Sequence, residues 1–322
     1  MSMNPVTSLL DTKVAHALQG KRVLITGASG FVGQHMARQG IAAGVEIHAV
    51  GRRHGPVGVI DHRADLADRV ATRAAVFAIA PDVVLNLASP GVAFGTADFP
   101  EILNTLVGGA EALLSACCEL PVRPHFVHIG TGFEYALQDR AICEDDPLVP
   151  SSTRYGAAKA AASATVGGFA GLLPLTILRP FNIYGGGDVA PRLASLIIAS
   201  ARAGQAIDVT RGEQLRDFLH IDDCSRVIWQ VAAEREPGNS FGVFNVGSGQ
   251  PRALREYIIS IGDALDRHGV PARINFGAMP YRQGEPMMAV PNLTRLNARF
   301  DWQPRIGFAE GVEDFVSWSQ SR

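Results

Sequence analysis

The chain has 322 residues, of which 47% are hydrophobic, and its 29 Lys and Arg residues against 31 Asp and Glu give a formal net charge of −2. A chain of this length can bury a large core and hold one larger domain together with a smaller second domain. The balanced charge, without a long basic run, argues against nucleic acid or a membrane surface as a partner. No apolar stretch reaches the ~18 residues that a membrane span needs.

The first twenty residues mix charged and polar side chains with apolar ones, so they lack the apolar segment of a secretory signal. We therefore expect a cytoplasmic protein in which residues 1–20 form an N-terminal extension with one short helix. The cysteines lack C-x-x-C spacing, which predicts buried free thiols and no metal site. They are Cys117, Cys118, Cys143 and Cys224.

Apolar β-prone runs alternate with helical patterns along most of the chain. The expected strands are 23–25, 45–50, 60–65, 83–87, 125–129, 175–178 and 244–246. The expected helices are 31–43, 67–78, 101–118, 155–170, 191–203 and 222–233, the last capped by Asp222 and Asp223. This alternation predicts an α/β fold with a Rossmann-type, doubly wound parallel sheet.

Two interleaved domains are expected within this fold. Residues 21–183 plus about 218–248 would form the dinucleotide-binding domain. Residues 184–217 plus 249–322 would form a smaller C-terminal α/β domain that binds the substrate.

A glycine-rich turn, Thr26–Gly33, separates the first strand from the first helix. Gly27 lets the chain turn, Gly30 lets a pyrophosphate approach the backbone, and Gly33 lets the helix lie close to the strand. The N–H groups and dipole at the helix start would hold the phosphates. A glycine-rich surface turn is the alternative for this turn alone. The predicted cofactor residues here are Gly27, Ser29, Gly30, Phe31, Val32 and Gly33.

The end of the second strand, Val50-Gly51-Arg52-Arg53, bears on the choice of cofactor. NAD-binding proteins usually have an acidic residue here to hold the ribose hydroxyls, whereas arginine suits the 2′-phosphate of NADP. Arg52 and Arg53 therefore favour NADP(H). NAD(H) is the alternative, with the two arginines in a solvated loop.

Other strand ends supply further cofactor candidates. Asp65 could accept a hydrogen bond from the adenine amino group while Leu66 packs on the ring, although Asp65 could equally cap a helix. Asn104 would support the loop around the nicotinamide end. The fourth strand ends in Leu87, Ala88 and Ser89, and the small residues there would give the cofactor room.

Tyr155 and Lys159 are four residues apart, which places both side chains on one face of a helix. A lysine beside a phenol favours the phenolate and lowers its pKa, so such a tyrosine can exchange a proton with an alcohol oxygen. Lys159 can also hold the cofactor ribose. Thr131, at the end of the fifth strand, supplies a hydroxyl for the substrate carbonyl.

The order of these motifs resembles the extended short-chain dehydrogenase/reductase family, also called the NAD-dependent epimerase/dehydratase family, over nearly all of residues 21–319. Further matches are LRPFNIYG at 178–185, RDFLHIDD at 216–223, FNVGSG at 244–249, RQGEP at 282–286 and FDWQP at 300–304. The resemblance implies a nucleotide-diphosphate sugar as substrate and adds Pro180 to the cofactor site.

The same resemblance implies a clamp for the sugar diphosphate. Asn182 would bond the diphosphate, while Arg216 and Arg282 would neutralise it. The structural alternatives are a turn-stabilising role for Asn182 and an ion pair of Arg216 with Asp217 or Asp222.

The residues after the fifth strand bear on the reaction. Family members that act as 4,6-dehydratases read Thr-Asp-Glu or Thr-Ser-Glu there, but this chain reads Thr131-Gly132-Phe133. Gly132 and Phe133 cannot transfer protons, so elimination is disfavoured unless Glu134 reaches the site. We expect Glu134 to touch the substrate or only solvent, and Gly132 and Phe133 to line the substrate site.

The leading hypothesis is a 4-ketoreductase of a nucleotide-linked 4-keto-6-deoxy sugar, in which Tyr155 donates the proton and Phe133 packs near the C6 methyl group. The first alternative is a nucleotide-sugar 4-epimerase with tightly bound NAD. A 4,6-dehydratase, a reductase of small carbonyl compounds and a catalytically silent dinucleotide-binding protein are the remaining alternatives.

The helices at 101–118 and 155–170 are rich in small residues. The resemblance implies that they pair across a two-fold axis as a four-helix bundle, giving a homodimer. The alternative is close packing onto the chain's own sheet. His128 is expected in the core, and His220 between the domains.

Overall fold

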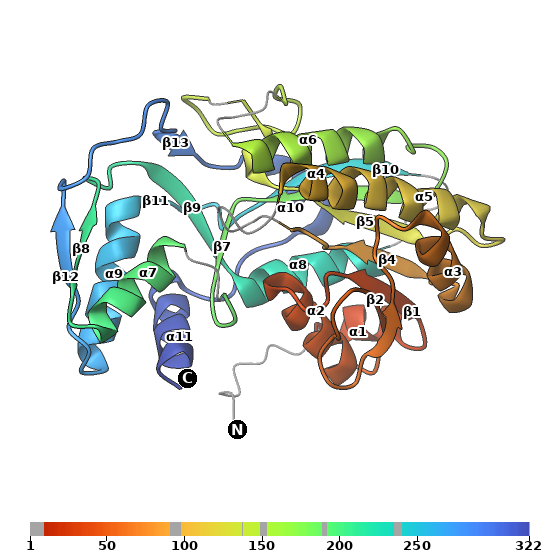
Figure 1. Cartoon of the computed structure of the whole chain (residues 1–322), viewed down its shortest axis with the longest axis horizontal. Helices are drawn as coiled ribbons and strands as arrows, with labels where there is room; N and C mark the ends of the chain where they lie inside the picture. The colour runs from red at the N-terminus through yellow and green to blue at the C-terminus, as the bar shows by residue number, and fades with distance from the viewer. Residues whose placement is uncertain are drawn as a thin grey trace.

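A seven-stranded parallel sheet organises the larger part of the molecule, which confirms the expected Rossmann-type α/β fold (Figure 1). The computed structural model describes residues 10–90, 98–136, 138–148, 153–188, 192–234 and 240–321. In spatial order the strands are β10 (Phe241–Val246), β6 (Leu175–Pro180), β5 (His125–Ile129), β4 (Val83–Asn86), β1 (Arg22–Thr26), β2 (Glu46–Gly51) and β3 (Ile60–Arg63).

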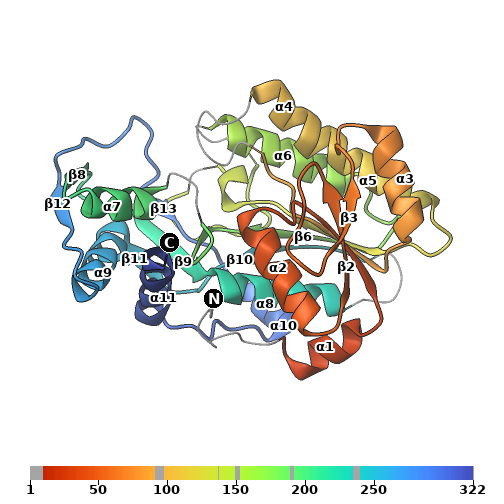
Figure 2. The ribbon, with the colours of Figure 1, turned by 60° about the horizontal axis from the view of Figure 1, so that its bottom comes forward.

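Helices cover both faces of this sheet (Figure 2). Successive strand residues point to opposite faces, so Val23 and Ile25 enter one core while Leu24 enters the other. The first core is closed by α1 (Thr12–Leu18), α2 (Phe31–Ala42), α8 (Ile221–Ala233) and α10 (Thr294–Phe300). The second is closed by α3 (Arg69–Ile79), α5 (Gly109–Glu119) and α6 (Arg154–Gly167).

The long helix expected at 101–118 is divided into three pieces, which corrects the sequence prediction. They are α4 (Phe99–Leu103), a π-helical turn at Asn104–Gly108, and α5. A π turn changes the phase of the helix that follows it. Here it precedes Gly109, where a Cβ atom would lie only 2.8 Å from the Cβ atom of Leu66. The missing side chain thus lets α5 lie directly on Leu66.

The C-terminal part has its own small sheets and its own core (Figure 1, left). β9 (Leu215–His220) pairs with β7 (Asn182–Tyr184), β11 (Pro251–Ala253) and β13 (Met288–Ala289). β8 (Ala206–Val209) pairs with β12 (Arg273–Phe276). The surrounding helices are α7 (Leu193–Arg202), α9 (Leu254–Arg267) and α11 (Phe308–Gln320).

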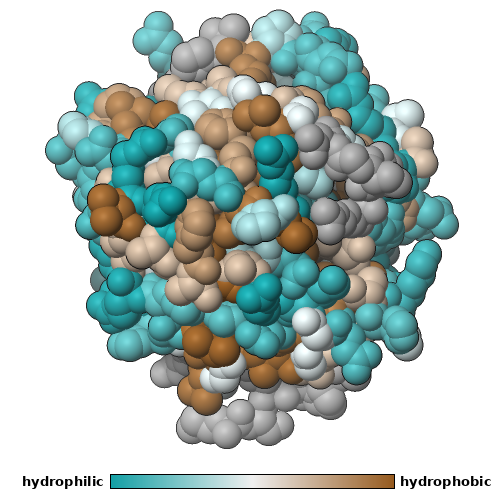
Figure 3. Space-filling model, turned by 90° about the vertical axis from the view of Figure 1, so that its right-hand side faces the viewer, coloured by the Kyte–Doolittle hydropathy of each residue, from teal (hydrophilic) through white to brown (hydrophobic). Residues whose placement is uncertain are grey.

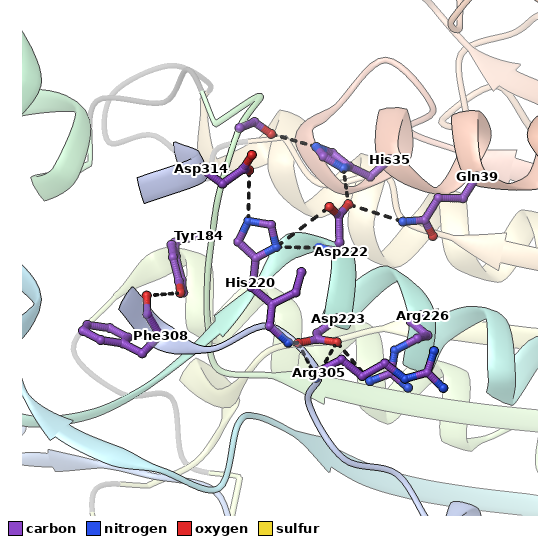
Figure 4. A network of polar contacts seen from close by, with 12 residues as sticks. His35, Gln39, Tyr184, His220, Asp222, Asp223, Arg226, Arg305, Phe308 and Asp314 are labelled. Carbon is purple, nitrogen blue, oxygen red and sulfur yellow. Dashed lines mark hydrogen bonds and ion pairs between the residues drawn. The ribbon is translucent and has the colours of Figure 1, made fainter. Parts of the chain in front are cut away.

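β9 continues directly into α8, and the cap of α8 differs from the prediction. His220 caps the helix, because its Nδ1 accepts a hydrogen bond of 3.3 Å from the N–H of Asp222. The aspartates point elsewhere: Asp223 accepts from the N–H groups of Arg305 and Ile306 (Figure 4). The buried His220 ring packs edge-on against Tyr184, as its expected packing role requires.

Asp222 ties α8 to α2 through His35 (Figure 4). His35 Nδ1 lies 3.0 Å from a carboxylate oxygen of Asp222, and Nε2 lies 2.7 Å from the carbonyl oxygen of Gly186. Both contacts are with acceptors, so both hydrogen bonds form only when the ring carries both protons. Burial raises the pKa of Asp222, but the hydrogen bond and charge of His35 outweigh it and leave that pKa below its usual value.

The surface opposite the C-terminal part mixes hydrophobic and hydrophilic residues, and its brown areas are interrupted by teal ones (Figure 3). Across the described ranges, no helix has the length and apolar character needed to cross a membrane.

We predict that Asp222→Asn lowers the free energy of unfolding by about 1–3 kcal/mol near neutral pH, because the buried His35 loses its charged partner. The lowered pKa of Asp222 means that its contribution is present above the unfolded-state pKa and is lost as the pH falls through the folded-state pKa. Urea unfolding at several pH values measures both effects. The control is Asp314→Asn, whose side chain is 42% exposed and whose loss should cost under about 0.5 kcal/mol. Equal losses of unfolding free energy in the two variants would contradict a stabilising role for the His35–Asp222 contact.

Candidate functional site

The turn between β1 and α2 has the form that an anionic group requires. Gly27 has φ +70°, and a Cβ atom there would lie 2.9 Å from the Cα of Ala88. A Cβ atom at Gly33 would overlap the carbonyl oxygen of Gly27. Gly30 begins α2 without any side-chain cap, and the first turn of the helix has no acidic residue. The first N–H groups of α2 can therefore receive phosphate oxygens, so the turn fits a dinucleotide.

The neighbouring strand end is fixed by Thr26, a residue that the sequence reasoning did not select. Its hydroxyl donates to Asn86 Oδ1 at 2.8 Å and accepts from the N–H groups of Leu87 and Ala88, both at 3.1 Å. The chain after β4 is thus held against the glycine turn. Its only sequence signal is that it directly precedes Gly27.

The expected adenosine-side residues lie together, but Arg52 has partners there. Its guanidinium lies 3.0 Å from Glu101 and 3.8 Å from Asp65, and Arg53 is exposed. Asp65 does not cap α3, because Asp68 accepts from the first N–H groups of that helix. The two carboxylates offset the charge of Arg52, a feature that the sequence reasoning missed because Glu101 is distant in the chain.

Of the remaining residues on this side, Leu66 is buried under Gly109, Asn104 is exposed on the π-helical turn, and Pro180 is buried at the end of β6.

Tyr155 meets Ser89 across the site: their hydroxyl oxygens are 3.2 Å apart. Lys159, one turn further along α6, is buried and donates to the carbonyl oxygen of Ile129 at 2.8 Å. An ammonium has three N–H donors, so two remain for further partners. The fold therefore brings three predicted residues together, Ser89 from the segment after β4 and Tyr155 and Lys159 from α6.

The ionisation of this pair differs from the sequence prediction. Burial raises the pKa of Tyr155, and the groups that oppose the rise are Ser89 and Arg192 rather than Lys159. Lys159 instead turns to Ile129, and burial lowers its own pKa to about 8, against the opposing charge of Glu134. In this state Tyr155 holds its proton, which suits a proton donor.

Thr131 starts a short 3-10 turn, Gly132–Glu134, just beyond β5. Its hydroxyl oxygen accepts from the N–H of Phe133 at 3.3 Å, leaving its own proton available to donate. A Cβ atom at Gly132 would lie 2.9 Å from the ring of Phe181. Phe133 is 47% exposed.

Glu134 contradicts the expectation of contact with substrate or solvent, since it is fully buried. One oxygen accepts from the N–H of Thr131 at 2.8 Å, and the other accepts from Arg179 Nε at 2.8 Å. The 3-10 turn directs the side chain back under Thr131 instead of outward. Burial is tolerated because both oxygens have partners.

His128 is a core residue, as expected. It lies buried in β5 with its Nδ1 3.1 Å from the side-chain nitrogen of Asn86. Burial, together with the charges of Lys159 and Arg179, keeps its pKa well below the usual value, so the ring is neutral.

The residues expected at a diphosphate lie in the C-terminal part and already have partners. Asn182 donates to the carbonyl oxygen of Asp217 at 2.9 Å. Arg216 pairs with Glu285 at 3.3 Å and donates to the carbonyl oxygen of Pro286, so neither alternative aspartate is its partner. Arg282 is exposed. A further cation was missed: Arg192, whose charge lowers the pKa of Tyr155.

Known proteins resemble the chain over almost its whole length. A dTDP-glucose 4,6-dehydratase of Xanthomonas campestris pv. campestris is 26% identical over 92% of this chain and 92% of its own. A probable UDP-glucuronate 4-epimerase of Rhizobium meliloti is 26% identical over 92% of this chain and 96% of its own. The solved structure of MoeE5 in complex with UDP-glucuronic acid and NAD has a TM-score of 0.80 and 28% identity, and the match covers 93% of this chain and 99% of that one.

The sequence model of the NAD dependent epimerase/dehydratase family matches residues 23–247, from β1 through the end of β10. With the glycine turn and the Tyr155–Lys159 helix in the geometry described above, this match places the chain: it belongs to the NAD dependent epimerase/dehydratase family.

Proposed function

We propose that the protein reduces the 4-keto group of a nucleotide-linked 4-keto-6-deoxy sugar. Two observations favour this choice over dehydration: Gly132 packs on Phe181, and Tyr155 keeps its proton. A site that protonates an oxygen but has no acid and base for elimination fits reduction better than dehydration.

The chain's own groups can perform the proton step. A nicotinamide cofactor bound at the glycine turn would supply the hydride for the new C4–H bond, as the C4–O double bond becomes single. Tyr155 gives its proton to that oxygen, and Thr131 donates a hydrogen bond to it. Ser89 orients the phenol from 3.2 Å, and Lys159 uses its remaining N–H donors for the ribose hydroxyls.

Dehydration is disfavoured by packing as well as by residue type. An aspartate or serine at position 132 would push its Cβ into the Phe181 ring, which lies 2.9 Å from that point. The only carboxylate of this turn, Glu134, faces away from the site and is bound to Arg179. The 26% identity to a 4,6-dehydratase therefore does not extend to the groups that elimination needs.

A nucleotide-diphosphate sugar is the proposed substrate class because the similar proteins act on or bind such sugars, according to their names. Arg216 and Arg282 would neutralise the diphosphate, with Asn182 beside them. In this proposal the diphosphate takes the place of Glu285 on Arg216, whose guanidinium is mostly buried.

NADP(H) is the proposed cofactor, because no acidic residue follows β2 and Arg52 can form bidentate bonds to a 2′-phosphate. The phosphate would compete with Glu101 for the guanidinium.

A nucleotide-sugar 4-epimerase with bound NAD is the second candidate. It is favoured by the NAD in the MoeE5 complex, by the epimerase relative, and by the two carboxylates that already hold Arg52. The same Tyr155 and Lys159 would serve it, so the residues near the nicotinamide do not separate the two reactions.

We further propose the two-domain division given by residues 21–183 plus about 218–248, with the remaining C-terminal segments binding the substrate. A homodimer through α4, α5 and α6 is also proposed. Within one chain, Ile102 and Leu106 already pack on Ala158 and Ala162, so the small residues of α6 serve internal contacts too.

For the reaction, we predict that the enzyme oxidises one NADPH for each 4-keto sugar consumed. We also predict that Tyr155→Phe lowers kcat by about 10²–10⁴-fold with cofactor affinity unchanged, because only the donated proton is removed. Loss of absorbance at the nicotinamide band, with fluorescence titration of the cofactor, measures both. Interconversion of two sugars without net cofactor oxidation would instead establish the epimerase.

For the cofactor, we predict a lower KM for NADPH than for NADH, and a loss of that preference by about tenfold or more in Arg52→Ala, because a charge-assisted bond to the phosphate is removed. Arg63→Ala, an exposed arginine at the end of the adjacent strand β3, is the matched control and should keep the preference. Equal KM values for the two cofactors in the unaltered enzyme would refute NADP selectivity.

A further inference from the structure

The turn after β5 is built around a buried carboxylate for which the proposed reaction has no direct use. Glu134 is fully buried, and a Cβ atom at Gly130 would overlap its Oε1. Glycine at position 130 thus makes room for the carboxylate, and the same oxygen accepts from the N–H of Thr131 at 2.8 Å. The space and the hydrogen bond together fix where the negative charge lies.

Arg179 holds the second oxygen and extends the contact into a buried polar network. Its Nε lies 2.8 Å from Glu134, and its Nη1 lies 2.9 Å from the hydroxyl of Tyr135. Tyr135 donates to Asn245 at 2.7 Å, which reaches the end of β10. The carboxylate therefore cannot turn away without breaking contacts in three elements.

Lys159 and Glu134 border the same stretch of main chain. The Lys159 ammonium donates to the carbonyl oxygen of Ile129 at 2.8 Å, and Oε1 of Glu134 lies against the next residue, Gly130. Burial disfavours its ammonium, and Glu134 is the group that opposes this effect. The other ionisable groups around the pair are His128 on β5, Arg179 on β6, Tyr155 on α6, Tyr135 and Glu144 after the 3-10 turn, and Arg192 before α7. Of these, His128 is held neutral and the arginines are cations, so they do not stabilise an ammonium.

We propose that Glu134 is a positioning residue for the site: its carboxylate holds the main chain of Thr131 and is the buried counter-charge for Lys159 across the Ile129–Gly130 main chain. The consequence for turnover rests on the proposed function, in which Lys159 binds the ribose and orients the cofactor for hydride transfer. The charge relation itself holds whatever the reaction is.

The test is direct because the sequence contains three lysines, Lys13, Lys21 and Lys159. In protein labelled with ¹³C-lysine, the Cε signal of Lys159 reports its protonation without any substrate. Glu134→Gln keeps the shape and the acceptor for Thr131 but removes the charge. We expect the titration midpoint of Lys159, about 8 in the unaltered protein, to fall by about one pH unit in this variant.

Turnover gives the second readout. The alkaline limb of the kcat–pH profile should move to lower pH in Glu134→Gln by about the same amount, with KM for the cofactor unchanged at neutral pH. Glu144→Gln is the matched control, since Glu144 is also a buried carboxylate of this network but accepts from the N–H of Asn245. Glu144→Gln should change neither the titration midpoint of Lys159 nor the alkaline limb of the kcat–pH profile.

The Lys159 titration can refute the proposal in two ways. An unchanged Lys159 midpoint in Glu134→Gln, or the same shift in Glu144→Gln, overturns the proposal. Should the single variant fail to fold, Glu134→Gln with Arg179→Met removes the stranded cation, and its Lys159 midpoint should still lie below that of the unaltered protein. Absence of any sugar reduction would remove the proposed function alone, because the lysine titration does not depend on it.

Discussion

The close approach of main chains at the carboxyl edge of the parallel sheet is the constraint on which the rest of the site depends. Gly27 brings the chain after β1 against Ala88, and Gly33 brings α2 against the Gly27 carbonyl. Thr26 then ties the two strand ends with three hydrogen bonds. Only because the backbones are this close can the first turn of α2 and the end of β4 border one ligand.

Buried charge is managed by pairing, and the pairs lie at the junctions between elements. His35 and Asp222 join α2 to α8 and to the chain after β7, while Glu134 and Arg179 join the turn after β5 to β6. Each pair satisfies its hydrogen bonds inside the protein, which is the condition for a buried ion pair to persist. Two polar pairs thus support the site: the buried ion pair of Glu134 with Arg179, and the partly buried contact of His35 with Asp222.

The sequence predicted most of the sheet, because its strands are continuous apolar runs and its turns carry glycine. It also selected Tyr155 and Lys159, whose types and spacing carry their chemistry. Ser89 was selected only as a small residue beside the cofactor, and its contact with the hydroxyl of Tyr155 was not predicted. The sequence did not predict the partners of Arg52, the cap of α8 or the burial of Glu134, because each depends on a residue distant in the chain or on the direction of one turn. The π-helical turn after α4 was also missed. It precedes Gly109, which packs on Leu66, a residue distant in the chain.

In the proposed reaction, this site transfers a hydride to C4 while Tyr155 protonates the oxygen. Its most direct measurement is a single turnover of a nucleotide-linked 4-keto-6-deoxy sugar with cofactor deuterated at the transferring position, analysed by NMR of the product. We expect deuterium at C4 of the sugar, in a one-to-one ratio with oxidised cofactor. A product without deuterium at C4 would contradict it.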